Sequence, residues 1–116
     1  MIVNNMLHDL NINFENEKPF KYYSVDNYLT DFNLIIEVMG DYWHGNPNSQ
    51  ASLNDVQKKN KRRDFAKHTF ILKYYNIQIL YLWENDIIKC PEKCYALIKK
   101  YVGSKGQLSN YHSYNY

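Results

Sequence analysis

Two carboxylates in the first half of the chain stand where their charge requires an explanation. Glu37 interrupts the apolar run Leu34–Met39, which is typical of a buried strand, and Asp26 lies in the strand-like segment before it. An ionised carboxylate in a buried strand is costly unless it is paired or binds a metal ion. Because hard oxygen ligands suit Mg²⁺, Asp26 and Glu37 are candidate metal ligands for Mg²⁺ or Mn²⁺.

The residues between the two strands predict how the carboxylates are placed. Asp31-Phe32-Asn33 favours a tight reversal in which Asn33 takes a positive φ. A hairpin centred between the first two of these residues puts Asp26 directly opposite Glu37, on the same face, with Cβ atoms about 4.5–5.5 Å apart. A three-residue loop would instead put Val38 opposite Asp26. The alternative without a metal is a strand Asp and a strand Glu that pair with Arg, Lys or backbone donors.

Further reactive side chains follow the strand that carries Glu37. Gly40 ends that strand, and Asp41, Trp43 and His44 come next. His44 is a candidate general base or proton donor to a leaving oxygen, and the alternative is a residue that caps the strand end. Trp43 either packs in the core or stacks on a base, and core packing is favoured because a lone Trp usually packs.

A long helix is predicted from about Val56 to Tyr75, and positive charge gathers in its first half. Between residues 55 and 68 there are six basic side chains and two acidic ones. A cationic helix end beside a carboxylate site suits a phosphodiester, and the alternative is a solvated face. The candidate nucleic-acid-binding residues are Lys59, Arg62, Arg63 and Lys67. The apolar stripe that we expect this helix to bury consists of Phe65, His68, Leu72 and Tyr75, bordered by Ile71.

The rest of the pattern predicts a single domain over residues 1–102 and a tail over residues 103–116. The expected elements are a short helix within 2–12, an extended segment at Pro19–Tyr23, a loop over 44–55, a strand at Ile77–Trp83 and a helix at Pro91–Val102. A chain of 116 residues, 45% hydrophobic, suits one modest core. The tail tyrosines either stack on bases or pack back on the domain: Tyr111, Tyr114 and Tyr116.

Composition excludes several classes of protein. No apolar run approaches the roughly 20 residues of a membrane span, and the N-terminus has no signal pattern, so we expect a cytoplasmic protein with no membrane partner. A net charge of +2 does not by itself imply a nucleic-acid partner. Cys90 and Cys94 lack the second ligand pair of a structural zinc site.

These residues carry a resemblance to a known family. The stretch VDNYLTDFNLIIEVMGDYWH, residues 25–44, resembles the core of the restriction-endonuclease-like (PD-(D/E)XK) nucleases. It is most similar to the branch related to very-short-patch-repair endonucleases and to certain phage and mobile-element (homing) endonucleases. The stretch RRDFAKHTFILKYYNIQILYLWENDI, Arg62–Ile87, resembles the helix and strand that follow in that branch, and the resemblance covers roughly Phe14 to Val102.

The resemblance implies an α/β fold with a mixed central sheet of about four strands flanked by helices. It also implies an Mg²⁺-dependent endonuclease that cleaves double-stranded DNA, with Asp26 and Glu37 matching the two acidic ligands of the family. The family's Lys, two residues after the second acid, is replaced by Met39. His44 and Lys67 are the candidate substitutes, and an early Glu, such as Glu17, can support the site in this branch.

Two other functions are compatible with the sequence. Met39 at the usual Lys position favours a catalytically inactive nucleic-acid-binding module on the same fold. The other is a structural or interaction protein without a nucleic-acid role. A 116-residue chain has little surface for recognition of a long DNA site, so a nuclease of high specificity would call for a homodimer or an accessory specificity domain.

Overall fold

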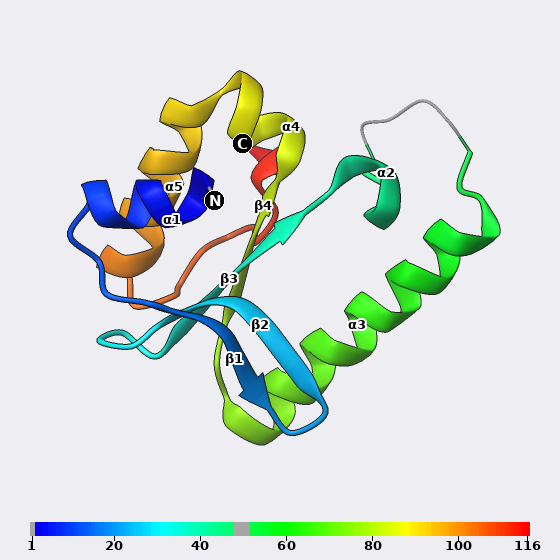
Figure 1. The fold of residues 1–116 in the computed structure, drawn as a ribbon, viewed down its shortest axis with the longest axis horizontal. Coiled ribbons are helices and arrows are strands. Elements are labelled where there is room, and N and C mark those ends of the chain that lie inside the picture. Colours follow the sequence, from blue (N-terminus) through cyan, green and yellow to red (C-terminus); the bar gives the residue numbers. More distant parts are fainter. Residues whose placement is uncertain (1, 48–51) are drawn as a thin grey trace.

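The computed structural model describes residues 2–47 and 52–116. Its centre is a sheet of four strands in the order β1-β2-β3-β4 (Figure 1). The first three strands pair antiparallel, and β3 and β4 pair parallel. Their bounds are Glu15–Phe20 for β1, Tyr23–Leu29 for β2, Leu34–Met39 for β3 and Ile79–Trp83 for β4. The expected mixed α/β sheet of four strands is therefore confirmed.

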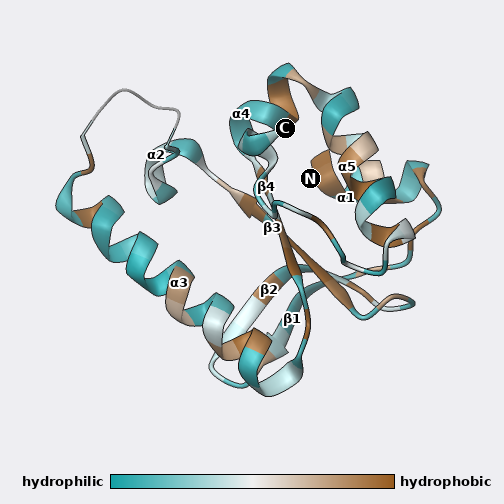
Figure 2. Ribbon diagram, turned by 180° about the vertical axis from the view of Figure 1, so that it is seen from behind, coloured by the Kyte–Doolittle hydropathy of each residue, from teal (hydrophilic) through white to brown (hydrophobic). Residues whose placement is uncertain are grey.

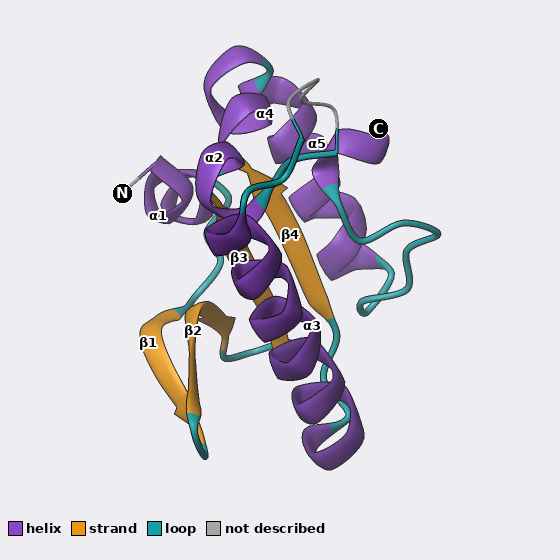
Figure 3. Cartoon of the chain, turned by 90° about the vertical axis from the view of Figure 1, so that its right-hand side faces the viewer, coloured by secondary structure: helices purple, strands orange, loops and turns teal. Residues whose placement is uncertain are grey.

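Helices cover both faces of β3 and β4. The connection from β3 to β4 runs through α2 (Asp41–His44) and α3 (Asp55–Tyr75), and α3 lies on one side of the two strands (Figure 3). The other side is packed by α1 (Ile2–Asp9) and α5 (Pro91–Gly103), with α4 (Glu84–Lys89) between β4 and α5. Within the described residues, no helix has the length and apolarity needed to cross a bilayer.

Side chains of the two parallel strands alternate between two hydrophobic clusters, as the period of a strand requires. Ile36 and Leu80 belong to the cluster under α1 and α5, whereas Ile35 and Ile79 belong to the cluster beneath α3. Glu37 follows the period of Ile35, so it faces α3. The buried carboxylate is thus directed at the one long helix with a basic first half.

The turn between β2 and β3 has the predicted conformation. Asn33 has φ 54°, and its N–H donates to Leu29 O at 2.9 Å. The backbone pairs Leu29–Leu34, Tyr28–Ile35 and Asn27–Ile36 all belong to one register. One further step along this register puts Asp26 opposite Glu37, which confirms the hairpin centre inferred from the sequence and excludes the three-residue loop.

Several element boundaries differ from expectation. The extended segment expected at Pro19–Tyr23 contains the turn between β1 and β2, and the first helix ends at Asp9. Helix α4 was not predicted. The last helix includes Gly103, and the strand before it begins at Ile79. Of the loop expected over 44–55, residues 48–51 lie outside the described residues.

The expectation for the buried face of α3 is wrong for Phe65, Leu72 and Tyr75, whereas His68 and Ile71 do lie on its inner side. Phe65 is 73% exposed, and Leu72 and Tyr75 are also exposed. The partly or fully buried residues of α3 are instead mostly polar: Gln57, Asn60, Lys61, Asp64, Lys67, His68, Phe70 and Ile71. The N-terminal half of α3 is mostly hydrophilic, and strongly hydrophobic positions gather mainly in its C-terminal part (Figure 2). The middle of the helix, from Lys61 to His68, lines cavities with mostly polar side chains, so apolar spacing did not identify its inner side.

The C-terminal tail packs back on the domain. His112 forms a parallel bridge with Tyr81 of β4, and Tyr81 N–H donates to Tyr111 O at 2.7 Å. Tyr111 and Tyr114 pack against the cluster beneath α3. Ser113 Oγ, which is buried, accepts from Trp83 N–H and donates to Asp86 Oδ2 at 2.6 Å. The tail thus extends the sheet beyond β4 at a single bridge and is fixed there.

Candidate active site

The site begins where the pairing of β2 and β3 ends. Beyond Asn27–Ile36 the side chain of Asp26 replaces the backbone as acceptor, because its Oδ2 receives the Val38 N–H at 2.8 Å. This hydrogen bond fixes the carboxylate of Asp26 against β3 and beside Glu37. The two acids thus meet at the point where the strands separate.

Glu37 is a buried acid with an unusual proton affinity. Its side chain is nearly inaccessible, and burial raises the pKa of its carboxyl to about 8. The neighbouring Asp26 carboxylate adds to this rise in pKa, and the Lys67 ammonium opposes it. Lys67 Nζ lies 2.6 Å from Glu37 Oε1, and no other donor of the described residues reaches that oxygen in hydrogen-bond geometry.

His44 is held by the packing of α2 against α3. Gln57 Nε2 donates to Tyr42 O, and Asn60 Nδ2 donates to Trp43 O at 2.8 Å, so two amides of α3 bind backbone carbonyls of α2. Gly45 ends α2 with φ 65°, and a Cβ there would lie 2.5 Å from a methyl group of Leu53. Both features favour glycine at this position.

The imidazole of His44 is paired with an acid that the sequence reasoning missed. His44 Nδ1 lies 2.6 Å from Asp64 Oδ2. A carboxylate only accepts hydrogen bonds, so it favours a proton on Nδ1 and leaves Nε2 as the basic nitrogen. The sequence gives only a modest indication that Asp64 belongs to the site. It is the only acid in the basic run from 58 to 67, and it stands three residues before Lys67 on the same helix.

All four candidate catalytic residues line one cavity. Its volume is about 260 Å³, and Asp26, Glu37, His44 and Lys67 contribute to its wall. The remaining lining residues are Ser24, Val38, Met39, Asp64 and Tyr81. Burial raises the pKa of the Tyr81 phenol, with Glu37 and Asp64 adding to the effect. Residues from both halves of the chain thus form one acidic pocket that contains a single lysine.

The other sequence candidates lie outside this cavity. Lys59, Arg62 and Arg63 are exposed on α3, whereas Lys67 is directed inward. Glu17 has a positive φ of 53° on β1 and accepts a hydrogen bond from Ser24 Oγ at 3.4 Å, so it reaches the cavity only through that serine. The core position favoured for Trp43 is wrong, since its side chain is 59% exposed beside the site.

The chemistry of the pocket fits a divalent cation. Two carboxylates face each other, and one of them is buried with a strongly raised pKa. A cation between them would offset the cost of burying that charge and the repulsion between the two carboxylates. The described residues contain no cluster of three or more His, Cys, Asp or Glu side chains suited to a metal. Mg²⁺ in proteins is commonly bound by only one or two carboxylates, with water and phosphate oxygens as its other ligands.

A comparison with solved structures finds the same fold in a nuclease. The chain is similar to the solved structure of the homing endonuclease I-Bth0305I catalytic domain, with a TM-score of 0.62 and 21% sequence identity. The similarity covers 91% of this chain and 94% of that one. No protein-family model and no curated protein matches the chain. The fold is thus one that a homing endonuclease catalytic domain also adopts.

Proposed function

We propose that this chain is a metal-dependent endonuclease that hydrolyses phosphodiester bonds of DNA. The observation that carries the proposal is the convergence of Asp26, Glu37, His44 and Lys67 in one cavity. Two acids, one of them buried with a raised pKa, line this cavity together with a paired histidine and a lysine, and such groups cluster at functional sites. Similarity of fold to a homing endonuclease catalytic domain supports the same reaction class.

In this proposal Asp26 and Glu37 hold Mg²⁺ or Mn²⁺. The ion would polarise the scissile phosphate and ease deprotonation of the attacking water. His44 accepts that proton on Nε2, and Asp64 keeps the imidazole in the tautomer that leaves Nε2 free. Lys67 balances the charge of Glu37 and of the phosphate as negative charge accumulates on it.

Lys67 also bears on the alternative of an inactive binding module. That alternative depends on Met39, which stands where the resembled family has its Lys. In the fold, however, α3 delivers an ammonium group to Glu37 from a different element, 2.6 Å from Oε1. The cavity therefore contains, in Lys67, the positively charged side chain that position 39 lacks, and we favour the active enzyme.

The exposed basic side chains supply the contact with the substrate. Lys59, Arg62 and Arg63 lie on α3, next to the cavity residues Asp64 and Lys67 in sequence. Phosphates of double-stranded DNA would bind there and place one phosphodiester at the cavity. We further propose that the chain belongs to the restriction-endonuclease-like branch that includes patch-repair and homing endonucleases.

The test is cleavage of supercoiled plasmid with Mg²⁺, Mn²⁺ or a chelator. Wild type should nick or cut the plasmid with either ion and stop in chelator. Asp26→Asn and Glu37→Gln should each abolish cleavage and leave the circular dichroism spectrum unchanged, because each removes a charge that the ion requires. The matched control is Asp31→Asn in the turn of the same hairpin. Undiminished cleavage by both site variants would overturn the proposal.

A further inference from the structure

A second, larger cavity adjoins the candidate active site. Its volume is about 520 Å³, within the range of about 300–1,000 Å³ typical of small-molecule sites. The two cavities are adjacent, because they share four lining residues: Met39, His44, Asp64 and Tyr81. A ligand seated at the acidic residues therefore has a neighbouring space to fill, and the proposed chemistry assigns no role to that space.

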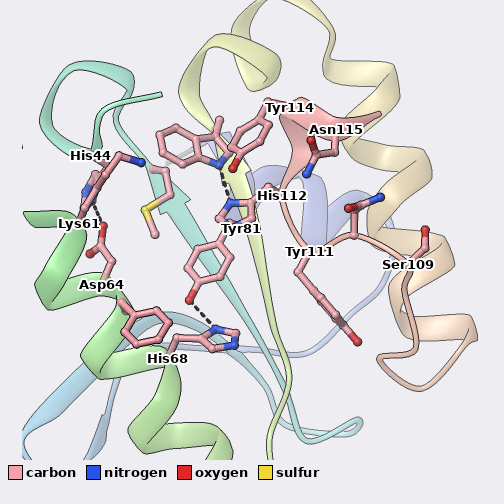
Figure 4. Close-up of a pocket in the computed structure, with 14 residues that line it drawn as sticks. His44, Lys61, Asp64, His68, Tyr81, Ser109, Tyr111, His112, Tyr114 and Asn115 are labelled. Carbon is pink, nitrogen blue, oxygen red and sulfur yellow. Dashed lines mark hydrogen bonds and ion pairs between the residues drawn. The ribbon is translucent and has the colours of Figure 1, made fainter. Parts of the chain in front are cut away.

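The walls of this cavity are aromatic and come from two separate parts of the chain. In Figure 4, His44, Lys61 and Asp64 lie on one side, and Tyr111, His112 and Tyr114 of the tail lie on the other. The rings of Tyr81 and His112 stack at 4.7 Å and 11°, and those of His112 and Tyr114 at 4.9 Å and 20°.

The tail wall is preformed. Trp83 Nε1–H donates to His112 Nδ1 at 3.0 Å, so His112 is held as an acceptor and uncharged. Burial likewise lowers the pKa of His112, to about 4. The buried hydroxyl of Ser113 anchors the next residue to Asp86 and β4. A ligand would thus meet fixed, neutral aromatic surfaces on the tail side, with the Lys61 ammonium and the Asp64 carboxylate on the side of α3.

Groups suited to a planar ligand remain available at this cavity. Phe65 lines it, is 73% exposed, and stacks on no other ring of the described residues. Asn110 and Asn115 also line it, and neither side-chain amide bonds another described side chain or backbone group. Aromatic faces with free amides fit a flat, uncharged ring that has hydrogen-bonding edges.

We propose that this cavity binds one nucleobase of the substrate, that of a nucleotide next to the scissile phosphate at the neighbouring acidic cavity. The inference rests on the proposed function, since the nuclease site is what would place the phosphate of the substrate beside this cavity. A base can enter such a cavity only when it has left the helical stack. The preferred substrate is therefore nucleic acid with an unpaired or extruded nucleotide at the cut: a bulge, a flap or a single strand.

Binding can be tested separately from cleavage. Anisotropy in chelator would compare labelled oligothymidylate with an abasic backbone of the same length. Stacking of one base predicts that wild type binds oligothymidylate about fivefold to a hundredfold more tightly. Phe65→Ala and Asn115→Ala should reduce this preference. Tyr74→Ala, an exposed aromatic change on the same helix outside the cavity, should keep it.

Cleavage distinguishes failure of this inference from failure of the proposed function. A duplex with one unpaired nucleotide should be cut at least tenfold faster by wild type than a fully paired duplex, and Phe65→Ala should narrow that ratio. Equal binding of abasic and thymidylate strands by wild type, together with normal plasmid cleavage, would overturn the base site and leave the nuclease intact. Base-dependent binding without metal-dependent cleavage would support the base site and overturn the nuclease.

Discussion

Lys67 Nζ lies 2.6 Å from Glu37 Oε1, which joins the inner face of α3 to the central strand β3. Thirty positions separate the two residues in sequence, so no short motif could contain both. Met39, on the same face of β3 as Glu37, lines the cavity without supplying a charge. The ammonium group that accompanies the acid therefore comes from the crossover helix.

This pairing predicts that Lys67 contributes to cleavage and not only to packing. Lys67→Met should lower the cleavage rate by about 10²–10³, the range for loss of one group that stabilises charge in a transition state. Lys67→Arg should restore part of the rate because it keeps the charge. Lys73→Met, in the last turn of α3, is the control. Single-turnover rates at saturating DNA would measure the effect, and a wild-type rate in Lys67→Met would exclude the role.

The raised pKa of Glu37 predicts how the metal-free protein responds to pH. The carboxyl has an ordinary pKa of 4.5 in the unfolded chain and a pKa of about 8 in the folded one. Between these values the folded chain binds one more proton than the unfolded chain. Its free energy of unfolding should therefore fall as pH rises from about 4.5 to about 8, by up to about 1.4 kcal/mol per pH unit.

Urea unfolding in chelator across that pH range would measure this dependence. Glu37→Gln should flatten the profile, because the amide does not titrate, and should stabilise the protein at pH 8. Glu84→Gln, an exposed acid at the start of α4, should reproduce the wild-type profile. A Glu37→Gln profile as steep as that of wild type would mean that another group is responsible.

The hairpin was predictable because its determinants are local. The turn residues fix the register, and the register alone places Asp26 opposite Glu37. The interruption of an apolar strand by an acid was likewise sufficient to single out Glu37. Both inferences use only the period of a strand and the geometry of a short turn.

The inner face of α3 was not predictable in the same way. Hydrophobic spacing selected Phe65 and Leu72, which are exposed, because a helix over a core normally buries its apolar side. Here the helix covers a cavity that needs Asp64 and Lys67, so its polar side faces inward. The role of the tail was also hidden, since Tyr111 and His112 join β4 through a single non-periodic bridge.

The exposed basic residues of α3 predict a salt-dependent contact with DNA. Replacing Lys59, Arg62 and Arg63 by Gln should weaken duplex binding and lower the slope of log affinity against log salt by about 0.9 for each phosphate that the variant no longer neutralises. Binding would be measured by anisotropy over a range of salt concentrations. Lys89, Lys99 and Lys100, three exposed lysines on α4 and α5, changed to Gln, are a control for the same change in net charge. An unchanged slope in the α3 variant would place the DNA on another surface.

The pairing of His44 with Asp64 predicts the outcome of a double-mutant cycle. His44→Ala should lower the cleavage rate by about 10²–10⁴ with little change in DNA affinity, as expected for loss of a general base. Asp64→Asn should lower it less, because the amide keeps the shape but no longer fixes the proton on Nδ1. The double variant should be no slower than His44→Ala, since Asp64 acts only through the imidazole.

His8→Ala on α1 is the matched histidine control, and Lys67→Ala should be measured in parallel because Lys67 is the rival for proton transfer. A double variant slower than His44→Ala by the full effect of Asp64→Asn would show that Asp64 acts independently of His44. If His44→Ala cleaves like wild type while Lys67→Ala is impaired, the proton-transfer role belongs to Lys67 and not to His44. The cavity contains both groups, so kinetics of these variants decides between them.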